Sequence, residues 1–254
     1  MQSLDFQKIK SDFDNDGFVL CEDFISPQEL EDLKSNLKRF IEEIVPTLGS
    51  SDAFYEDSQD SSSLKQVFRM AHHDPFFHEM VNGSRFEKLA EILLGEKIAK
   101  AEVEYFNKPA GIGKPTPPHQ DAYYFMITPP QALTFWIPLE NVDAANGCLH
   151  YLKGSHTKGM RLHGRTQTLG FSQGIVDYGT EEDLAVETAV PMKAGGVLVH
   201  HAMTVHSAPG NYSLNRARKV IGLVFFGESA QEDDEAKAAY REKLKAERAV
   251  AAQN

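Results

Sequence analysis

The sequence has few cysteines and no long apolar run, and each shortage excludes a class of protein. Cys21 and Cys148 are the only cysteines, and neither has a metal-ligand or redox spacing. This excludes a disulfide framework and predicts reduced, buried thiols. No apolar stretch approaches the ~20 residues that a membrane-spanning helix needs, and the first residues show no apolar signal core. We therefore expect a cytoplasmic protein without a membrane partner.

Basic residues are also scarce. Lysine and arginine number 26 against 37 aspartates and glutamates, which gives a formal net charge of −11 at pH 7. A surface of this sign repels the phosphates of nucleic acids and of anionic membranes, so neither is expected as a partner. The net charge does not exclude an anionic small molecule, because a local basic pocket is enough to hold one.

Length and composition predict one domain. The chain has 254 residues, of which 41% are hydrophobic and 25% charged, enough to bury a single large core. We expect the domain to span residues 1–254, with its core at about 13–227 and a charged C-terminal helix at 228–254. The expected oligomeric state is a monomer or a homodimer.

Two amphipathic helices are predicted in the first hundred residues. The capping box Ser26–Glu29 precedes apolar residues at helical spacing, and Pro46 ends this element. A second capping box, Ser84–Glu87, precedes another apolar stripe, which Gly95 ends. We expect both helices to pack against a sheet.

From Ile98 onward, short apolar runs alternate with turn residues, as is typical of an antiparallel sandwich or barrel. Asn146-Gly147 is a strong tight-turn signal. The pattern predicts a mainly β fold with flanking helices, a cupin-like double-stranded β-helix or jelly roll, whose strand ends converge on one mouth. The expected strands are Gly17–Cys21, Leu133–Leu139, Cys148–Leu152, Val186–Val190, Val197–His201 and Val220–Phe226.

Three polar stretches are too long for tight turns, namely Gly49–Ser63, Ala110–Pro118 and Gly154–Leu184. Loops of this length in a compact domain are usually functional or disordered. The last two border the candidate metal-binding segment described next, so we expect them to act as lids. His163, within the third stretch, is expected to be exposed.

The run His119-Gln120-Asp121 is followed, much later in the chain, by another candidate ligand, His206. Two imidazoles and one carboxylate form the facial triad that holds iron(II) while leaving three coordination positions open. In a strand, residues i and i+2 point to the same side, so His119 and Asp121 can hold one ion while Gln120 faces away. The same alternation places Tyr123 on the metal side.

Arg218 follows the distal histidine by a dozen residues. A guanidinium is suited to a bidentate grip on a carboxylate, which points to a co-substrate that is a diacid. Arg216 lies two residues earlier and therefore on the same side of an extended chain. Strand alternation does not distinguish the two arginines. A rival metal set of His200, His201 and His206 is less attractive because it lacks a carboxylate.

These residues lie in the segments YFNKPAGIGKPTPPHQDAYYF, LTFWIPLENVDAANGCLHYLKGSH and GGVLVHHAMTVHSAPGNYSLNRARKVIGLVFF. From about Phe13 to Phe226, the chain closely resembles the phytanoyl-CoA dioxygenase family of iron(II)/2-oxoglutarate oxygenases, including its phytanoyl-CoA-dioxygenase-domain-containing members. The resemblance implies that His119, Asp121 and His206 bind iron(II).

The resemblance also implies a site for 2-oxoglutarate. The family arginine opens the last core strand, which matches Arg218. Arg216 stays as the less favoured substitute, because the loop after His206 is one residue longer than is usual in the family. The resemblance places Trp136 beside 2-oxoglutarate, although a lone tryptophan is usually a core residue. Lys65 matches a family lysine that reaches this cofactor.

The function implied by the resemblance is an iron(II)- and 2-oxoglutarate-dependent dioxygenase. Such an enzyme uses dioxygen to hydroxylate a C–H bond of a small-molecule substrate, and releases succinate and CO₂. Related halogenases carry Gly or Ala at the carboxylate position, so Asp121 favours hydroxylation. The family acts on acyl-CoAs, amino acids, phosphonates and natural products, and the lack of an extended basic patch favours a small metabolite over an acyl-CoA. The alternative from another class is a catalytically silent jelly-roll protein that binds or senses a metabolite.

Overall fold

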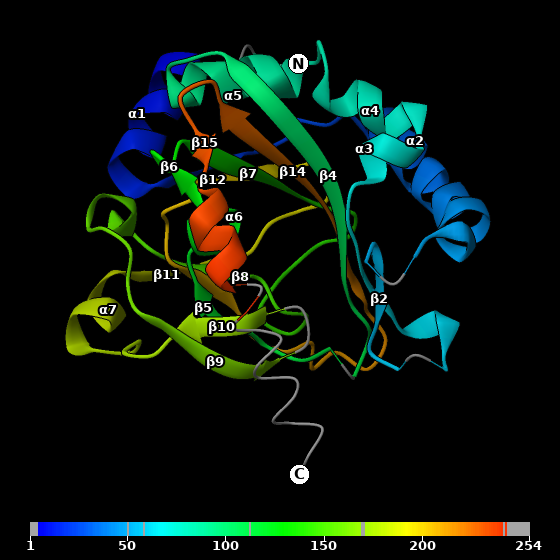
Figure 1. Cartoon of the computed structure of the whole chain (residues 1–254). Helices are drawn as coiled ribbons and strands as arrows, with labels where there is room; N and C mark the ends of the chain where they lie inside the picture. Colours follow the sequence, from blue (N-terminus) through cyan, green and yellow to red (C-terminus); the bar gives the residue numbers. More distant parts are fainter. Residues whose placement is uncertain are drawn as a thin grey trace.

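The computed structural model describes residues 5–49, 51–57, 59–111, 113–168, 171–240 and 242. Two antiparallel sheets face each other, and helices cover the outer face of the larger sheet (Figure 1). This arrangement confirms the predicted jelly roll with flanking helices. No helix in the described part of the chain is long and apolar enough to cross a membrane.

The strands follow the predicted pattern closely. The larger sheet consists of β1 (Phe18–Cys21), β12 (Val197–His201), β7 (Ala132–Pro138), β14 (Arg218–Gly227), β4 (Ile98–Lys108), β3 (Leu64–Val67) and β2 (Ala53–Tyr55), in that spatial order. The smaller sheet consists of β11 (Glu187–Val190), β8 (Leu149–Leu152), β13 (His206–Ala208) and β5 (Thr116–His119). Two further pairs join β9 (His163–Thr168) to β10 (Phe171–Ile175) and β6 (Ile127–Thr128) to β15 (Gln231–Glu232).

The helices are α1 (Phe6–Asp16), α2 (Pro27–Arg39), α3 (Met70–His73), α4 (Pro75–Val81), α5 (Arg85–Leu94), α6 (Asp121–Phe125) and α7 (Glu181–Val186). Short π and 3-10 turns occupy Phe40–Ile44, Val45–Thr47, Ser61–Ser63 and Ser155–Thr157. The capping box predicted at Ser26 is complete, because Ser26 and Glu29 each bond the other's backbone N–H. At α5 only half of the predicted box forms, since the Glu87 side chain bonds the N–H of Gly83 instead.

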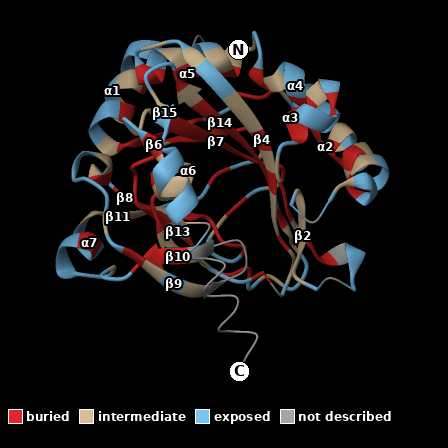
Figure 2. Ribbon diagram, in the orientation of Figure 1, coloured by how far each residue is buried: buried red, intermediate tan, exposed pale blue. Residues whose placement is uncertain are grey.

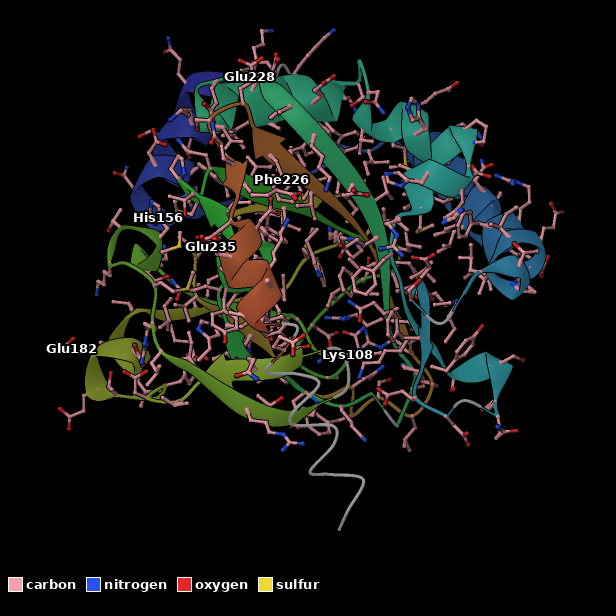
Figure 3. All side chains as sticks on the ribbon, in the orientation of Figure 1. Lys108, His156, Glu182, Phe226, Glu228 and Glu235 are labelled. Carbon is pink, nitrogen blue, oxygen red and sulfur yellow. The ribbon has the colours of Figure 1, made fainter. Side chains whose placement is uncertain are left out.

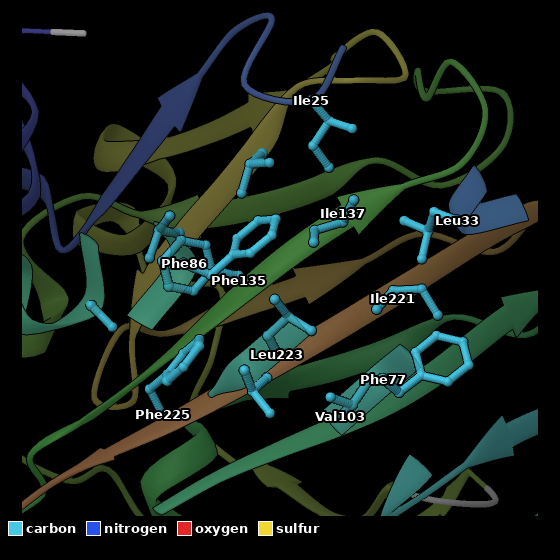
Figure 4. Packing of buried hydrophobic residues seen from close by; sticks show 14 of the residues in the cluster. Ile25, Leu33, Phe77, Phe86, Val103, Phe135, Ile137, Ile221, Leu223 and Phe225 are labelled. Carbon is cyan, nitrogen blue, oxygen red and sulfur yellow. The ribbon is translucent and has the colours of Figure 1, made fainter. Parts of the chain in front are cut away.

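The main hydrophobic core lies between the helices and one face of the larger sheet (Figures 2 and 4). Alternate residues of β14, Ile221, Leu223 and Phe225, point into this core beside Phe135 of β7. Burying a side chain of this size contributes about 1.5–3 kcal/mol. Because successive residues of a strand face opposite sides, the residues between them point toward the smaller sheet, where the site forms.

All three long polar stretches contain regular structure, which corrects the prediction of loops. Gly49–Ser63 contains β2, which pairs with β3 at the edge of the larger sheet. Gly154–Leu184 contains the β9–β10 hairpin and the start of α7. β2 is half-buried, but His163 of β9 and Gln173 and Ile175 of β10 are buried, so a polar composition does not mark these segments as exposed loops. Ala110–Pro118 ends in β5.

Other predictions have mixed outcomes. Cys21 and Cys148 are free and buried, as expected. The Asn146-Gly147 turn forms, with a φ of 87° at Gly147, but it connects the two sheets rather than a hairpin. Residues 234–240 of the predicted C-terminal helix are helical, and most of the remainder lies outside the described residues.

Candidate active site

His119, Asp121 and His206 lie together between the two sheets. One candidate ligand atom from each residue lies within 4.8 Å of the other two. The two histidines are cross-strand partners on β5 and β13. Their Nε2 atoms lie 3.4 Å and 3.6 Å from Oδ1 of Asp121. The fold thus brings the three predicted iron ligands into one group with two imidazoles and one carboxylate.

The segment that carries His119 and Asp121 differs from the predicted continuous strand. β5 ends at His119, and Asp121 is the first residue of helix α6. Gln120 between them keeps an extended backbone with φ −120° and ψ 128°, so the two flanking side chains still point to one side. The Gln120 side chain donates to the carbonyl of Met203 at 2.8 Å and accepts from the N–H of Arg161 at 2.8 Å. These bonds fix the segment.

Backbone carbonyls orient both histidine rings. Nδ1 of His119 lies 2.9 Å from the carbonyl oxygen of Pro117, and Nδ1 of His206 lies 2.9 Å from that of Thr204. A carbonyl oxygen only accepts, so each Nδ1 carries a proton, and each Nε2, which faces Asp121, is the ring nitrogen that could bind a metal. Burial lowers the pKa of His206 well below its usual range, which favours the neutral ring that a metal requires.

The second oxygen of Asp121 is held by side chains of the larger sheet. The Thr134 hydroxyl donates to Oδ2 at 2.9 Å, and Nε2 of His200 lies 3.2 Å from the same oxygen. The hydroxyl of Tyr151 lies 2.8 Å from Nδ1 of His200. Burial opposes ionisation of Asp121, but the surrounding histidines hold its pKa well below the usual range. Sequence reasoning missed Tyr151 and Thr134, because apolar strands predict neither contact.

A cavity of about 320 Å³ extends from this group over the larger sheet. Its volume is at the lower end of the ~300–1,000 Å³ typical of ligand pockets. The side chains that line it include Lys65, Glu104, Phe106, Lys108, Tyr124, Phe125, Trp136 and Arg218. All three residues predicted to contact 2-oxoglutarate therefore border the cavity that also contains the candidate metal ligands.

Strand register orders the side chains along the cavity. Near the candidate metal ligands, His200 of β12 is paired with Thr134 of β7. At the other end, Arg218 of β14 is paired with Lys108 of β4. The row between these ends consists of Glu104, Gly222 and Trp136. Figure 3 labels Lys108 of β4 and Phe226 of β14, which lie near opposite ends of the whole β4–β14 pair.

The structure separates the two candidate arginines. Arg218 is buried, and its guanidinium carbon lies 5.3 Å from the ring centre of Trp136. In the described part of the chain, no carboxylate forms an ion pair with Arg218. Burial lowers its pKa to about 10. Arg216, in contrast, binds both oxygens of Asp143 at 2.9 Å on the surface. Of the two arginines, only Arg218 lines the cavity.

Two lysines reach the same end of the cavity. Lys65 is ion-paired with Glu56 at 2.9 Å. Lys108, which sequence reasoning missed, is buried and donates to the carbonyl of Pro209 at 2.7 Å. Burial and the neighbouring Arg218 lower the pKa of Lys108 to about 6. Alternation along β4 was the available signal for Lys108, since Lys100, Glu102, Glu104 and Lys108 all lie on one face of the strand.

Two predictions near the metal ligands are wrong. Because α6 is helical, strand alternation does not continue past Asp121, and Tyr123 stacks on His163 at a ring separation of 4.1 Å. Tyr124 and Phe125 line the cavity instead. His163 is 5% exposed, and its Nε2 accepts the N–H of Gln120 at 3.2 Å. His163 is therefore buried and holds the backbone between His119 and Asp121, rather than being exposed.

Comparisons with known proteins agree with this geometry. The model of the phytanoyl-CoA dioxygenase (PhyH) family matches residues 13–220. The chain is similar to a phytanoyl-CoA dioxygenase of Arabidopsis thaliana, with 26% identity over 246 residues that cover 83% of this chain and 85% of the relative. It is also similar to phytanoyl-CoA dioxygenase domain-containing protein 1 of Danio rerio, with 26% identity over 245 residues that cover 79% and 83%.

The fold is similar to that of a solved epimerase. The crystal structure of the epimerase SnoN, in complex with Fe³⁺, alpha-ketoglutarate and nogalamycin RO, superposes with a TM-score of 0.70 and 22% sequence identity. The match covers 89% of this chain and 85% of SnoN. At this identity the likeness establishes the fold and not the substrate.

Proposed function

The chain belongs to the phytanoyl-CoA dioxygenase family, and we propose that it hydroxylates a C–H bond of a small-molecule substrate. Its class is that of the iron(II)- and 2-oxoglutarate-dependent dioxygenases, which consume dioxygen. One observation carries the proposal: the His119–Asp121–His206 group and the buried, carboxylate-free guanidinium of Arg218 border the same cavity.

The donor set fits the two cofactors. His119, Asp121 and His206 would hold iron(II), since two neutral imidazoles and one carboxylate are the ligands of non-haem iron oxygenases. Arg218 would bind the distal carboxylate of 2-oxoglutarate, with Trp136 beside it. A buried cation without a counter-charge is costly, and a bound dianion offsets that cost. Lys65 would add positive charge at the same end, although its ion pair with Glu56 weakens this role.

Bound iron would supply the oxidative chemistry, in which one atom of dioxygen enters succinate as 2-oxoglutarate loses CO₂, and the other converts a substrate C–H bond into C–OH. The chain supplies orientation. Pro117 and Thr204 fix the ring nitrogens of the ligands, while Thr134 and His200 fix the outer oxygen of Asp121. The buried surroundings keep bulk water from the reacting atoms. Asp121 supplies a carboxylate at the position where the related halogenases have none, which supports hydroxylation.

The cavity supports a small substrate over an acyl-CoA. Its volume of about 320 Å³ has to hold 2-oxoglutarate as well as the reacting part of the substrate. Acyl-CoA is retained as the alternative, because the relatives named above are phytanoyl-CoA dioxygenases or contain that domain.

The test is succinate formation by the purified protein with iron(II), 2-oxoglutarate and a panel of small metabolites and acyl-CoAs. We expect basal succinate release, stimulation by the true substrate, and a product heavier by one oxygen atom in mass spectrometry. The control is Asp121→Ala with its folding checked by circular dichroism. Succinate release no greater than that of Asp121→Ala, together with calorimetric binding of 2-oxoglutarate, would indicate the silent binding or sensor protein.

A further inference from the structure

Glu104 is a cavity residue that neither the iron site nor the arginine end uses. It projects from the middle of β4, and its carboxyl borders the cavity. Within the described part of the chain, no lysine, arginine or hydrogen-bond donor contacts that carboxyl. Burial, with Asp121 and Glu102 as further contributors, raises the pKa of Glu104 to about 8. An ionised carboxylate here would therefore gain from a cationic partner.

In the described part of the chain, none of the basic residues that line the cavity contacts the Glu104 carboxyl. Arg218 lies at the Lys108 end, and Lys114 is exposed. Lys108 lies four residues further along the same strand, about 13 Å away at a rise of ~3.3 Å per residue. It donates to the carbonyls of Ala208 and Pro209. Lys65 pairs with Glu56. A cation for Glu104 therefore has to come from outside the described chain.

The surroundings of Glu104 suit an amine. Gly222 is its cross-strand partner, and a Cβ on Gly222 would lie 3.1 Å from Cε2 of Phe106 and 3.9 Å from Cβ of Glu104. The carboxyl and the aromatic ring thus border the same space, which the glycine keeps from being filled. A carboxylate next to an aromatic face is a favourable environment for an ammonium group, through ion pairing and cation–π attraction.

We propose that Glu104 recognises the primary substrate, and that this substrate carries a cationic amino group which ion-pairs with Glu104 beside Phe106. The proposal rests on the proposed function, because the charge balance favours a cationic substrate only when iron(II) and 2-oxoglutarate are bound. There, iron(II) and Arg218 carry as much positive charge as Asp121 and the 2-oxoglutarate dianion carry negative charge. Without a cationic partner, the raised pKa keeps Glu104 mostly protonated near pH 7. Its ionised form would add one negative charge, which a monocationic substrate compensates, whereas an acyl carboxylate would add a second.

The experiment measures binding of three probes of similar size to the anaerobic holoprotein with iron(II) and 2-oxoglutarate. The probes are benzylamine, benzyl alcohol and benzoate, and their affinities come from isothermal titration calorimetry. We expect benzylamine to bind the wild type at least about tenfold more tightly than benzyl alcohol, since a hydrogen bond to a charged group contributes about 1.5–3 kcal/mol. In Glu104→Gln, which keeps the shape and removes the charge, this preference should fall below about threefold.

Glu102→Gln is the matched control, because Glu102 lies on the same strand and face and does not border the cavity. Because the Glu102 charge adds to the raised pKa of Glu104, this variant should keep the amine preference and not weaken it. The proposal is overturned if benzoate binds as tightly as benzylamine, if no probe binds, or if Glu104→Gln keeps the preference. A higher KM for 2-oxoglutarate in Glu104→Gln, without loss of amine preference, would make Glu104 a co-substrate contact instead.

Succinate release separates this inference from the proposed function. Succinate formed by a wild type without amine preference would refute the role of Glu104 and leave the dioxygenase assignment intact. Amine preference that depends on Glu104, in a protein that forms no succinate, would refute the dioxygenase assignment and leave the amine site standing.

Discussion

Nε2 of His200 lies 3.2 Å from Oδ2 of Asp121, so a histidine outside the metal-binding group holds the metal-binding carboxylate. Tyr151 in turn contacts the other ring nitrogen of His200 at 2.8 Å. Both residues are almost fully buried, with exposures of 1% and 0%. The two contacts form a chain from the smaller sheet through His200 to Asp121. They leave Oδ1 directed toward the two histidine ligands.

His200 and Tyr151 are therefore positioning residues, and their effects should be coupled. Loss of a partner behind a metal ligand typically costs about 10–100-fold in metal affinity or activity. We expect His200→Phe to weaken iron(II) binding by this amount and Tyr151→Phe to weaken it less. The double variant should resemble His200→Phe alone, because Tyr151 acts through His200.

The measurement is the iron(II) dissociation constant, taken beside the melting temperature of the metal-free protein. His201→Phe is the matched control, since His201 lies near Phe13 of α1, with ring centres 6.2 Å apart, and not at the metal ligands. Additive losses in the double variant would refute the chain. So would a lower melting temperature without any change in iron affinity.

Replacing His119, Asp121 or His206 by alanine should abolish iron-dependent 2-oxoglutarate turnover in each case. Each residue supplies one of the three ligand atoms that lie within 4.8 Å of one another. Succinate release measures the loss, and circular dichroism shows that the domain still folds. The assignment is wrong if His206→Ala stays near normal while His201→Ala loses activity.

Much of this site could be predicted from the sequence. The spacing of His119 and Asp121 follows from local strand geometry, and the family resemblance implied His206. The jelly roll follows from apolar alternation, and the HxD spacing places two ligands on one side whether or not Asp121 belongs to the strand. Gln120 stays extended, so the strand argument gave the correct orientation although α6 begins at Asp121. Tyr123 shows the limit of that argument, because helical geometry begins directly after the motif.

Other features depend on contacts that strand alternation and composition do not predict. Arg216 and Arg218 are equivalent by alternation, and only the fold shows that Asp143 binds the first and leaves the second in the cavity. The role of Glu104 depends on which face of β4 meets the cavity, and on the lack of a side chain at Gly222 opposite. Both facts follow from sheet register between strands far apart in the sequence.

Arg218→Ala should raise the apparent KM for 2-oxoglutarate by at least about tenfold. A charge-assisted pair contributes about 1.5–3 kcal/mol, and each 1.4 kcal/mol corresponds to a factor of about ten. Initial rates of succinate formation at varied 2-oxoglutarate give this value. Arg216→Ala is the matched control, because Arg216 binds Asp143 on the surface. Equal or greater damage in Arg216→Ala would reverse the assignment.

Lys108 should make the stability of the protein without ligands depend on pH. Burial and Arg218 lower the pKa of Lys108 from 10.5 to about 6 in the folded protein. Between these two values the unfolded chain binds the lysine proton and the folded chain does not, so the free energy of unfolding rises with pH. The cost of burying this group is therefore full below pH 6 and is released progressively as the pH approaches 10.5.

Lys108→Met removes this titration while keeping a side chain of similar length. The difference in unfolding free energy between wild type and Lys108→Met should therefore shift in favour of the wild type as the pH rises from 6 to 10, measured by urea unfolding of metal-free protein. Other titrating groups contribute to both proteins and largely cancel in the difference. Lys114→Met changes an exposed lysine at the rim of the same cavity and should show a flat difference. A flat difference for Lys108→Met as well would mean that Lys108 stays protonated in the folded protein, and that its bonds to the carbonyls of Ala208 and Pro209 balance the cost of burial.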